Sequence, residues 1–257
     1  MIQAKRFNPT VAFLTLLKKE VIRFKKVAFH TVAAPVISSF LYLVVFSAAI
    51  GERAVGDGYQ QFLVPGLVMM AVLQNAFANT SSSFVQSKIS GTLVFILMPP
   101  MNGYMIAAAY ILASILRGLL VGVCVLAATM LFTTVSLVYP GWILVFAVLG
   151  ALIMAALGLI AAIWAQRYEE MGVIQNFLIM PLTFLGGVFY STSSLPGMWQ
   201  DIARMNPLFY LIDGFRGGFI GRFESDPFLS LVMALPIGIV LTVVCALLIQ
   251  KGYRIRS

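Results

Sequence analysis

Six long stretches in which apolar residues run almost without a break constrain this chain more than any other feature. They cover residues 31–50, 61–82, 104–134, 142–165, 173–190 and 228–249. A helix needs about 20 apolar residues to cross the hydrocarbon core of a bilayer. Within lipid, a helix also satisfies the hydrogen bonds of its own backbone. The sequence therefore predicts an all-α integral membrane protein with six transmembrane helices.

The composition supports a membrane protein and argues against the soluble classes. Of the 257 residues, 61% are apolar and 10% are charged, whereas soluble domains carry about 25% charged residues. Cys124 and Cys245 fall inside apolar stretches, and the single histidine, His30, has no candidate metal ligands beside it in the sequence. We expect neither a disulfide framework nor a bound cofactor from these residues.

The net charge of +8 is better explained by membrane topology than by nucleic-acid binding. Six spans place both termini on one side, together with the loops at 84–103 and 166–172. By the positive-inside rule, an excess of basic residues on that side predicts that both termini are cytoplasmic. Twelve basic residues lie on that side (Lys5, Arg6, Lys18, Lys19, Arg23, Lys25, Lys26, Lys88, Arg167, Lys251, Arg254 and Arg256) and four on the other (Arg53, Arg204, Arg216 and Arg222).

Residues 1–28 are predicted to form an amphipathic helix that lies in the cytoplasmic interface. Asn8 followed by Pro9 is typical of a helix start. Apolar residues then recur at helical spacing, and basic residues occupy the other side. An ordinary positively charged flank that fixes the topology is equally compatible with this pattern. The apolar positions are Phe13, Leu17, Val21, Phe24 and Ala28, and the basic ones are Lys18, Lys19, Arg23 and Lys26.

The stretch 181–223 reads neither as a simple span nor as a soluble loop. A Gly186-Gly187 pair, a polar turn and a Pro-Gly break precede the apolar segment 207–220, which is too short to cross the bilayer. Asp213 and Arg216 lie three residues apart on one helix face, where they can pair. We therefore expect short re-entrant helices in an extracytoplasmic region at 191–226, held by this pair and gating the exit.

The chain shows no recognisable motif for catalysis. The phosphate-binding G-x-x-x-x-G-K-[ST], the zinc motif H-E-x-x-H and the nucleophile motif G-x-S-x-G do not occur in the sequence. The adjacent carboxylates Glu169 and Glu170 fit a solvated turn better than an active site. The sequence therefore favours a protein that is not itself an enzyme.

A few polar residues inside the predicted spans are candidates for an intramembrane role. Arg117 is a charge within a span, and such charges are costly and tend to face an interior or a partner. Its span is long, so reaching an interface is an alternative. Gln74 and Asn75, with Asn79, fit hydrogen bonds between helices better than ligand binding.

Five segments of the chain resemble permeases of the ABC-2 type, the second class of ABC exporters. These are QFLVPGLVMM (61–70), SSSF (81–84), PLTFLGGVFYS (181–191), LP-x-x-W (195–199) and NPLFYLIDGFRGGF (206–219). The resemblance extends over essentially the whole chain, so residues 1–257 read as one ABC-2 type transmembrane domain. The five segments are close to the polysaccharide and drug-export branch, which includes YadH-like and nodulation-factor export permeases.

This resemblance implies a partner and a division of labour. Such permeases dimerise and bind two copies of a separate ATPase, which carries the ATP and Mg²⁺. The connector at 84–103 would hold the coupling helix, and 191–222 would hold a pair of short extracytoplasmic helices. The implied function is export of a lipid-linked glycan, a lipid or a hydrophobic drug-like molecule across the inner membrane. An ion-coupled secondary transporter and a non-catalytic membrane scaffold are the alternatives. The residues expected to couple to the ATPase are Gln86, Lys88, Leu93 and Leu97.

Overall fold

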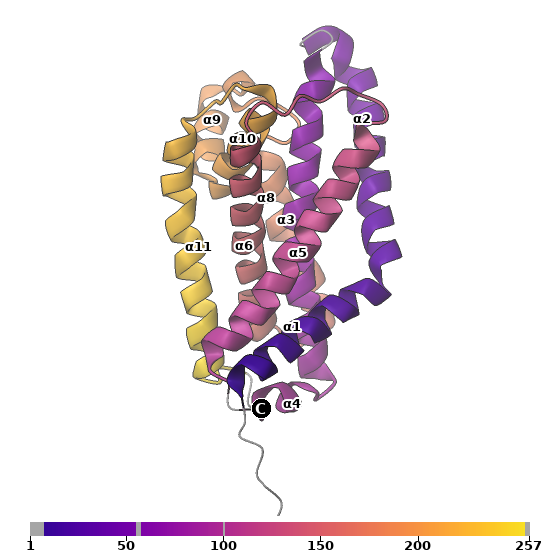
Figure 1. Cartoon of the computed structure of the whole chain (residues 1–257). Coiled ribbons are helices and arrows are strands. Elements are labelled where there is room, and N and C mark those ends of the chain that lie inside the picture. Colours follow the sequence, from indigo (N-terminus) through magenta and orange to yellow (C-terminus); the bar gives the residue numbers. More distant parts are fainter. Residues whose placement is uncertain (1–7, 55–57, 100, 255–257) are drawn as a thin grey trace, which may run out of the picture.

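Long helices that run side by side make up most of the molecule (Figure 1). The computed structural model describes residues 8–54, 58–99 and 101–254, with the side chains of 49–54 left out, and no strand occurs among them. The all-α prediction is confirmed for this part of the chain. Lys5, Arg6, Arg256 and the side chain of Arg53, which entered the charge comparison, lie outside it. The α-helices are α1 Pro9–Lys26, α2 Ala28–Ala54, α3 Tyr59–Ile89, α4 Leu93–Leu97, α5 Gly103–Thr129, α6 Pro140–Trp164, α7 Tyr168–Ile174, α8 Met180–Leu185, α9 Gly197–Met205, α10 Pro207–Ile220 and α11 Pro227–Gln250.

Five of these helices, α2, α3, α5, α6 and α11, are long and apolar enough to cross a membrane. The fifth predicted span, 173–190, is not among them: its helix begins earlier, at Tyr168, and is built from three consecutive pieces. These are α7, a π-helical turn at Gln175–Ile179, and α8. Together they cover residues 168–185, which corresponds to about 27 Å of helix. The π turn ends two residues before Pro181, which cannot donate the backbone hydrogen bond of a regular helix.

The polar residues that follow the first two predicted spans, 31–50 and 61–82, are still helical in the structure. α2 continues through Gly51 to Ala54, and α3 runs on through the polar serines to Ile89. In α3 the hydroxyls of Ser82 and Ser87 donate to the carbonyls of Ala78 and Ser83, four residues back. Serine side chains that bond in this way are compatible with a helix interior, which explains why the polar run does not end it.

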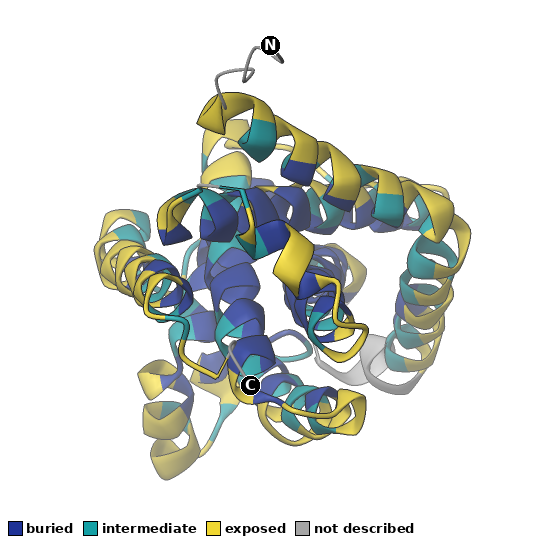
Figure 2. Cartoon of the chain, turned by 90° about the horizontal axis from the view of Figure 1, so that it is seen from below, coloured by how far each residue is buried: buried dark blue, intermediate teal, exposed yellow. Residues whose placement is uncertain are grey.

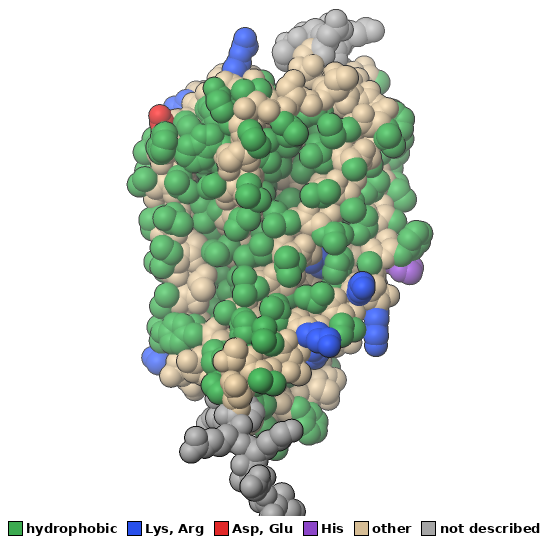
Figure 3. Space-filling model, in the orientation of Figure 1, with side chains coloured by type: hydrophobic (Ala, Val, Ile, Leu, Met, Phe, Trp, Pro, Cys, Tyr) green, Lys and Arg blue, Asp and Glu red, His purple; other side chains and the backbone are tan. Residues whose placement is uncertain are grey.

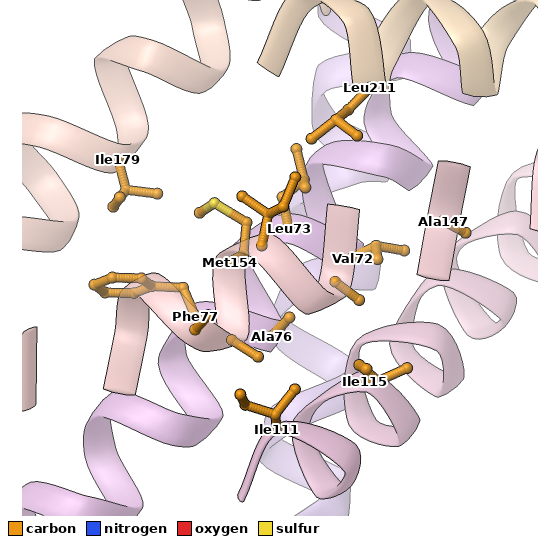
Figure 4. Packing of buried hydrophobic residues seen from close by; sticks show 14 of the residues in the cluster. Val72, Leu73, Ala76, Phe77, Ile111, Ile115, Ala147, Met154, Ile179 and Leu211 are labelled. Carbon is orange, nitrogen blue, oxygen red and sulfur yellow. The ribbon is translucent and has the colours of Figure 1, made fainter. Parts of the chain in front are cut away.

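The centre of the molecule is α3, which packs against α2, α5, α6 and α10. Figure 2 shows that the buried residues line the inner faces of the helices, while their outer faces are exposed. In the close view of Figure 4, Leu73 and Phe77 of α3 lie among side chains from α6 and the π turn. Gly158 of α6 permits this close packing, because a Cβ there would lie 2.5 Å from both the Phe77 carbonyl oxygen and the Thr80 hydroxyl. Small residues at such crossings are typical of membrane helices.

The two ends of the molecule carry different elements (Figure 1). α1 crosses the lower end obliquely with α4 beside it, and α11 also ends at this end, whereas α9 and α10 lie at the upper end. On the face shown in Figure 3, hydrophobic side chains cover the middle. The lysines and arginines there lie toward the ends and in the lower part, where α1 runs.

Candidate functional site

At the lower end, the short helix α4 presents an apolar face to the outside. Leu93 and Ile96 are buried against the protein. By contrast, Val94, Phe95 and Met98 are 60%, 72% and 71% exposed. The positive φ of Gly91, +68°, turns the chain from α3 into α4 and sets which face points inward. Among the predicted coupling residues, Gln86 is exposed, Leu97 is half-buried and Leu93 is buried.

Lys88, the fourth predicted coupling residue, is directed into the protein. Its Nζ donates to the carbonyls of Ile163 and Ala165, at 2.9 and 2.8 Å. These are among the last carbonyls of α6, which have no partner within their own helix. Lys88 therefore closes the end of α6. This geometry favours a structural role for it, whereas the exposed residues of α4 are free to contact a partner.

An apolar groove of about 860 Å³ runs between α1 and α4. Val11, Thr15 and Leu16 line it from α1, and Phe95 and Ile96 line it from α4. The two elements thus form one continuous surface at the lower end of the molecule. Sequence reasoning placed both segments on this side but could not identify Phe95 and Met98, because a five-residue helix has no periodicity from which to read its faces.

Helix α1 begins as predicted and is joined to the spans by buried polar groups. Asn8 caps it, because its Oδ1 accepts a hydrogen bond from the Thr10 N–H at 3.0 Å. Glu20 is 1% exposed. Its carboxylate accepts from the Ser83 hydroxyl at 2.5 Å and from Arg23 Nε at 3.2 Å. Glu20 is the one acidic residue within this basic helix and was not among the predicted residues.

Arg23 and Arg117 converge on the same side chain of α3. Arg23 Nη2 and Arg117 Nη1 donate to Asn79 Oδ1 at 2.8 and 3.1 Å, and Asn79 Nδ2 donates to Ser114 Oγ at 2.7 Å. The placement of Arg23 on the solvated side of α1 was therefore wrong: it is half-buried and points inward. Arg117, in turn, faces an interior partner, and Asn79 forms the predicted hydrogen bonds between helices.

At the upper end, Asp213 and Arg216 are 3% and 4% exposed on α10. The expected direct pair is wrong, since the described residues form no salt bridge between them. Instead, the Asp213 carboxylate accepts from the backbone N–H groups of Glu224 and Ser225, at 3.0 and 2.9 Å. The two residues are three apart in the helix, but each side chain binds the backbone of a different neighbouring loop: Asp213 binds residues 224–225 and Arg216 binds residues 187–188.

Arg216 binds the backbone that follows α8. Its Nη2 donates to the carbonyls of Gly187 and Val188, and its guanidinium lies 3.8 Å from the centre of the Phe62 ring. Gly66 of α3 allows the Val188 backbone to approach this closely, because a Cβ at Gly66 would lie 2.6 Å from the Val188 carbonyl oxygen. Two carbonyls of the non-helical backbone after α8 are thus paired with a protein side chain.

Replacing Asp213 with alanine is expected to loosen this end of the molecule. Two backbone N–H groups would lose their acceptor, at a cost of about 1–3 kcal/mol, which lowers the melting temperature of the purified protein by about 5 °C. The exposed Asp201→Ala in α9 serves as the control and should leave it unchanged. The double change with Arg216→Ala should melt lower than either single variant. A double variant milder than Asp213→Ala would show that the two side chains do pair.

The remaining candidates, Gln74 and Asn75, lie on α3 beside a cavity between α2, α3 and the α7–α8 segment. Asn75 Nδ2 donates to the Ala71 carbonyl at 3.0 Å, which is a bond within its own helix.

The adjacent carboxylates Glu169 and Glu170 lie at the start of α7. Glu170 accepts from the Gln166 N–H at 2.9 Å. With Glu169 it lies in the first turn of α7, where carboxylates are favoured.

Taken together, the apolar helices, the charged helix laid across one end and the short helices at the other describe a multi-pass helical membrane protein. The chain belongs to the ABC-2 type transporter family, whose pattern matches residues 11–220, and this confirms the resemblance seen in the sequence. It is 36% identical over 252 residues to the inner membrane transport permease YadH of Escherichia coli strain K12, covering 96% of this chain and 98% of that protein. Nodulation protein J of Rhizobium meliloti is 28% identical over 216 residues, 81% of each chain. Nodulation protein J of Rhizobium leguminosarum bv. trifolii is 26% identical over 217 residues, 82% of each.

Proposed function

We propose that this chain is the permease subunit of an ATP-driven exporter whose energy comes from a separate ATPase. One observation carries the proposal within this family. The exposed apolar face of α4 lies beside α1, and α1 is joined to α3 through Glu20 and Arg23, which bind Ser83 and Asn79. Phenylalanine and methionine are enriched where proteins meet. A partner bound at α4 and α1 could therefore move the spans through buried polar contacts.

The proposed assembly holds two permeases and two ATPases, with ATP and Mg²⁺ bound by the ATPases. It lies in the inner membrane, the location in the name of the YadH relative. We assign six spans, with the α7–α8 segment as the fifth, so that both termini are cytoplasmic. α1 then lies in the cytoplasmic interface, which suits its exposed Lys18, Lys19 and Lys26.

In the proposed mechanism, ATP binding closes the two ATPases against α4 and α1, and the spans respond by opening a path. A ligand shifts such an equilibrium only by its different affinity for the two states. α9 and α10 dip into the outer leaflet and control the exit, with Asp213 and Arg216 fixing α10 to its neighbouring loops. The transported molecule belongs among lipid-linked glycans, lipids and hydrophobic drug-like compounds.

Co-expression with a phosphate-loop ATPase encoded beside this chain tests the proposal. The tagged permease should retain the ATPase in equal amounts through purification in mild detergent. Hydrolysis by that complex should also respond to the permease, compared with the ATPase alone. If the ATPase is neither retained nor changed in activity, the proposal fails. Transport by the permease alone, driven by an ion gradient, would identify a secondary transporter.

A further inference from the structure

A hollow of about 460 Å³ lies along α1. Its lining residues recur at intervals of three, four and seven, so they share one side of the helix. Four of the six are basic and none is acidic, and two of the six also border the α1–α4 groove. A hollow with charges of one sign attracts ions of the opposite sign. The lining consists of Thr15, Lys18, Lys19, Ile22, Arg23 and Lys26.

The positive charge of this hollow is only partly balanced within the protein. Lys19 Nζ and Arg23 Nε each lie 3.2 Å from a different oxygen of Glu20, whose side chain is fully buried. One carboxylate thus serves two cations. Lys18 and Lys26 are exposed and form no salt bridge with any described residue. The hollow therefore carries a surplus of positive charge.

A further positive charge lies behind Arg23. Arg23 Nη2 and Arg117 Nη1 meet at Asn79 Oδ1, which is a neutral acceptor. The Nε of Arg117 is buried without a hydrogen-bond partner in the described part of the chain, and Arg117 forms no salt bridge there. Two like charges held this close repel each other. An anion in the hollow would therefore stabilise the place where α1 meets α3.

The surroundings of the hollow match a lipid better than a dissolved anion. Exposed apolar side chains lie among the lysines of α1, since Val11, Leu14 and Ile22 are 59%, 54% and 43% exposed. Figure 3 shows the lysines and arginines of the lower part beside the hydrophobic surface that covers the middle of the molecule. Basic and apolar residues on one interfacial helix bind membranes that contain anionic lipids. A phospholipid offers both kinds of group, because its phosphate lies directly above its acyl chains.

We propose that this hollow binds the phosphate of an anionic phospholipid in the cytoplasmic leaflet. The inference rests on the topology given with the proposed function, which places α1 in that interface. Lys18 and Lys26 contact the phosphate, and charge-assisted hydrogen bonds of this kind are strong. The bound phosphate also lies beside Arg23 and supplies the counter-charge that Arg23 and Arg117 lack. A zwitterionic lipid brings no net charge, so the hollow should select anionic headgroups.

Photolabelling of the purified permease in phosphatidylcholine nanodiscs, without ATPase, tests the proposal. The probe is phosphatidylglycerol with a photoreactive diazirine in its acyl chain close to the headgroup, compared with phosphatidylcholine that carries the same diazirine. At physiological salt, the phosphatidylglycerol probe should label α1 at a concentration about 25-fold lower, because two lysines near a phosphate contribute about fivefold each. Equal labelling of α1 by the two probes would overturn the assignment.

Two neighbouring lysines separate a defined site from general attraction between α1 and the membrane. Lys26→Gln removes a lysine that lines the hollow and should weaken phosphatidylglycerol labelling of α1 about fivefold. The matched control Lys25→Gln removes an exposed lysine outside the lining. It should weaken labelling less than about twofold, since salt screens exposed charges beyond about 8 Å. Both variants should keep the melting temperature of the unchanged protein. Equal weakening by the two would show diffuse attraction only and contradict the site.

Two further measurements distinguish the lipid from other anions. Unlabelled phosphatidylglycerol should displace the probe, whereas inorganic phosphate should not. Displacement by both alike would assign the hollow to a dissolved anion and overturn the proposal. If Lys26→Gln left lipid labelling unchanged but reduced retention of the co-expressed ATPase, the hollow would be a protein contact and the lipid site would be refuted. Loss of lipid selectivity with full retention of the ATPase would refute the lipid site alone and not the export function.

Discussion

Replacing Arg216 with alanine is expected to deplete the folded permease more than any other single change in α10. The carbonyls of Gly187 and Val188 are buried, and both would lose their donor. Each unpaired buried carbonyl costs about 1–3 kcal/mol, a large fraction of the stability of an ordinary domain. We expect a fall in melting temperature of about 10 °C, measured on the purified protein, and a matching loss of monodisperse protein from membranes.

Two companion variants make this result interpretable. Arg222→Ala removes an exposed arginine just after the same helix and should behave like the unchanged protein. Arg216→Lys keeps the charge and a hydrogen-bond donor but loses the planar guanidinium. Its melting temperature should therefore lie between that of Arg216→Ala and that of the unchanged protein. If Arg216→Ala were as stable as Arg222→Ala, the guanidinium would not be holding the segment after α8.

Phe95→Asp in α4 is expected to abolish most of the binding to the ATPase while leaving the permease folded. Phe95 is 72% exposed, so its loss should not disturb the fold. If it anchors the interface, its removal costs about 2 kcal/mol or more, which is about 30-fold in Kd. The measurement is the amount of ATPase retained by the tagged permease over a range of ATPase concentrations.

Phe132→Asp is the matched control for this prediction. Phe132 follows α5 at the opposite end of the molecule and is 61% exposed, so the same chemical change is made away from the proposed interface. Both variants should melt at the temperature of the unchanged protein. Equal retention of the ATPase by the two variants would contradict the placement of the interface on α4.

The sequence was sufficient to predict the elements that are marked by long apolar stretches or by local capping residues. The long apolar stretches became α2, α3, α5, α6 and α11, and the Asn8 cap opened α1 where expected. The expectation of short helices here followed from the Pro-Gly break and from the shortness of the apolar segment 207–220, where the structure has α9 and α10. Each of these features depends on residues that are close together in the chain, so local physical chemistry was enough to identify them.

Partners that are distant in the chain could not be predicted in this way. Lys88 resembles a surface lysine in the sequence, but it closes α6, 75 residues away. Asp213 and Arg216 have the spacing of an ion pair, yet the structure brings loop backbone to each of them. Glu20 was overlooked because a single acid in a basic helix reads as solvated, whereas its burial depends on Ser83 of α3. Spacing shows which side chains share a face, and tertiary packing decides what that face meets.

Site-specific crosslinking tests most directly whether an ATPase docks on the α4 end of this permease. A photoreactive amino acid placed at Phe95, and separately at Phe132, is irradiated in the complex with the co-expressed ATPase. We predict a covalent permease–ATPase product from position 95 and none from position 132. Crosslinking from position 132 alone would invert the proposed topology, and no product from position 95 in an intact complex would show that the ATPase docks elsewhere.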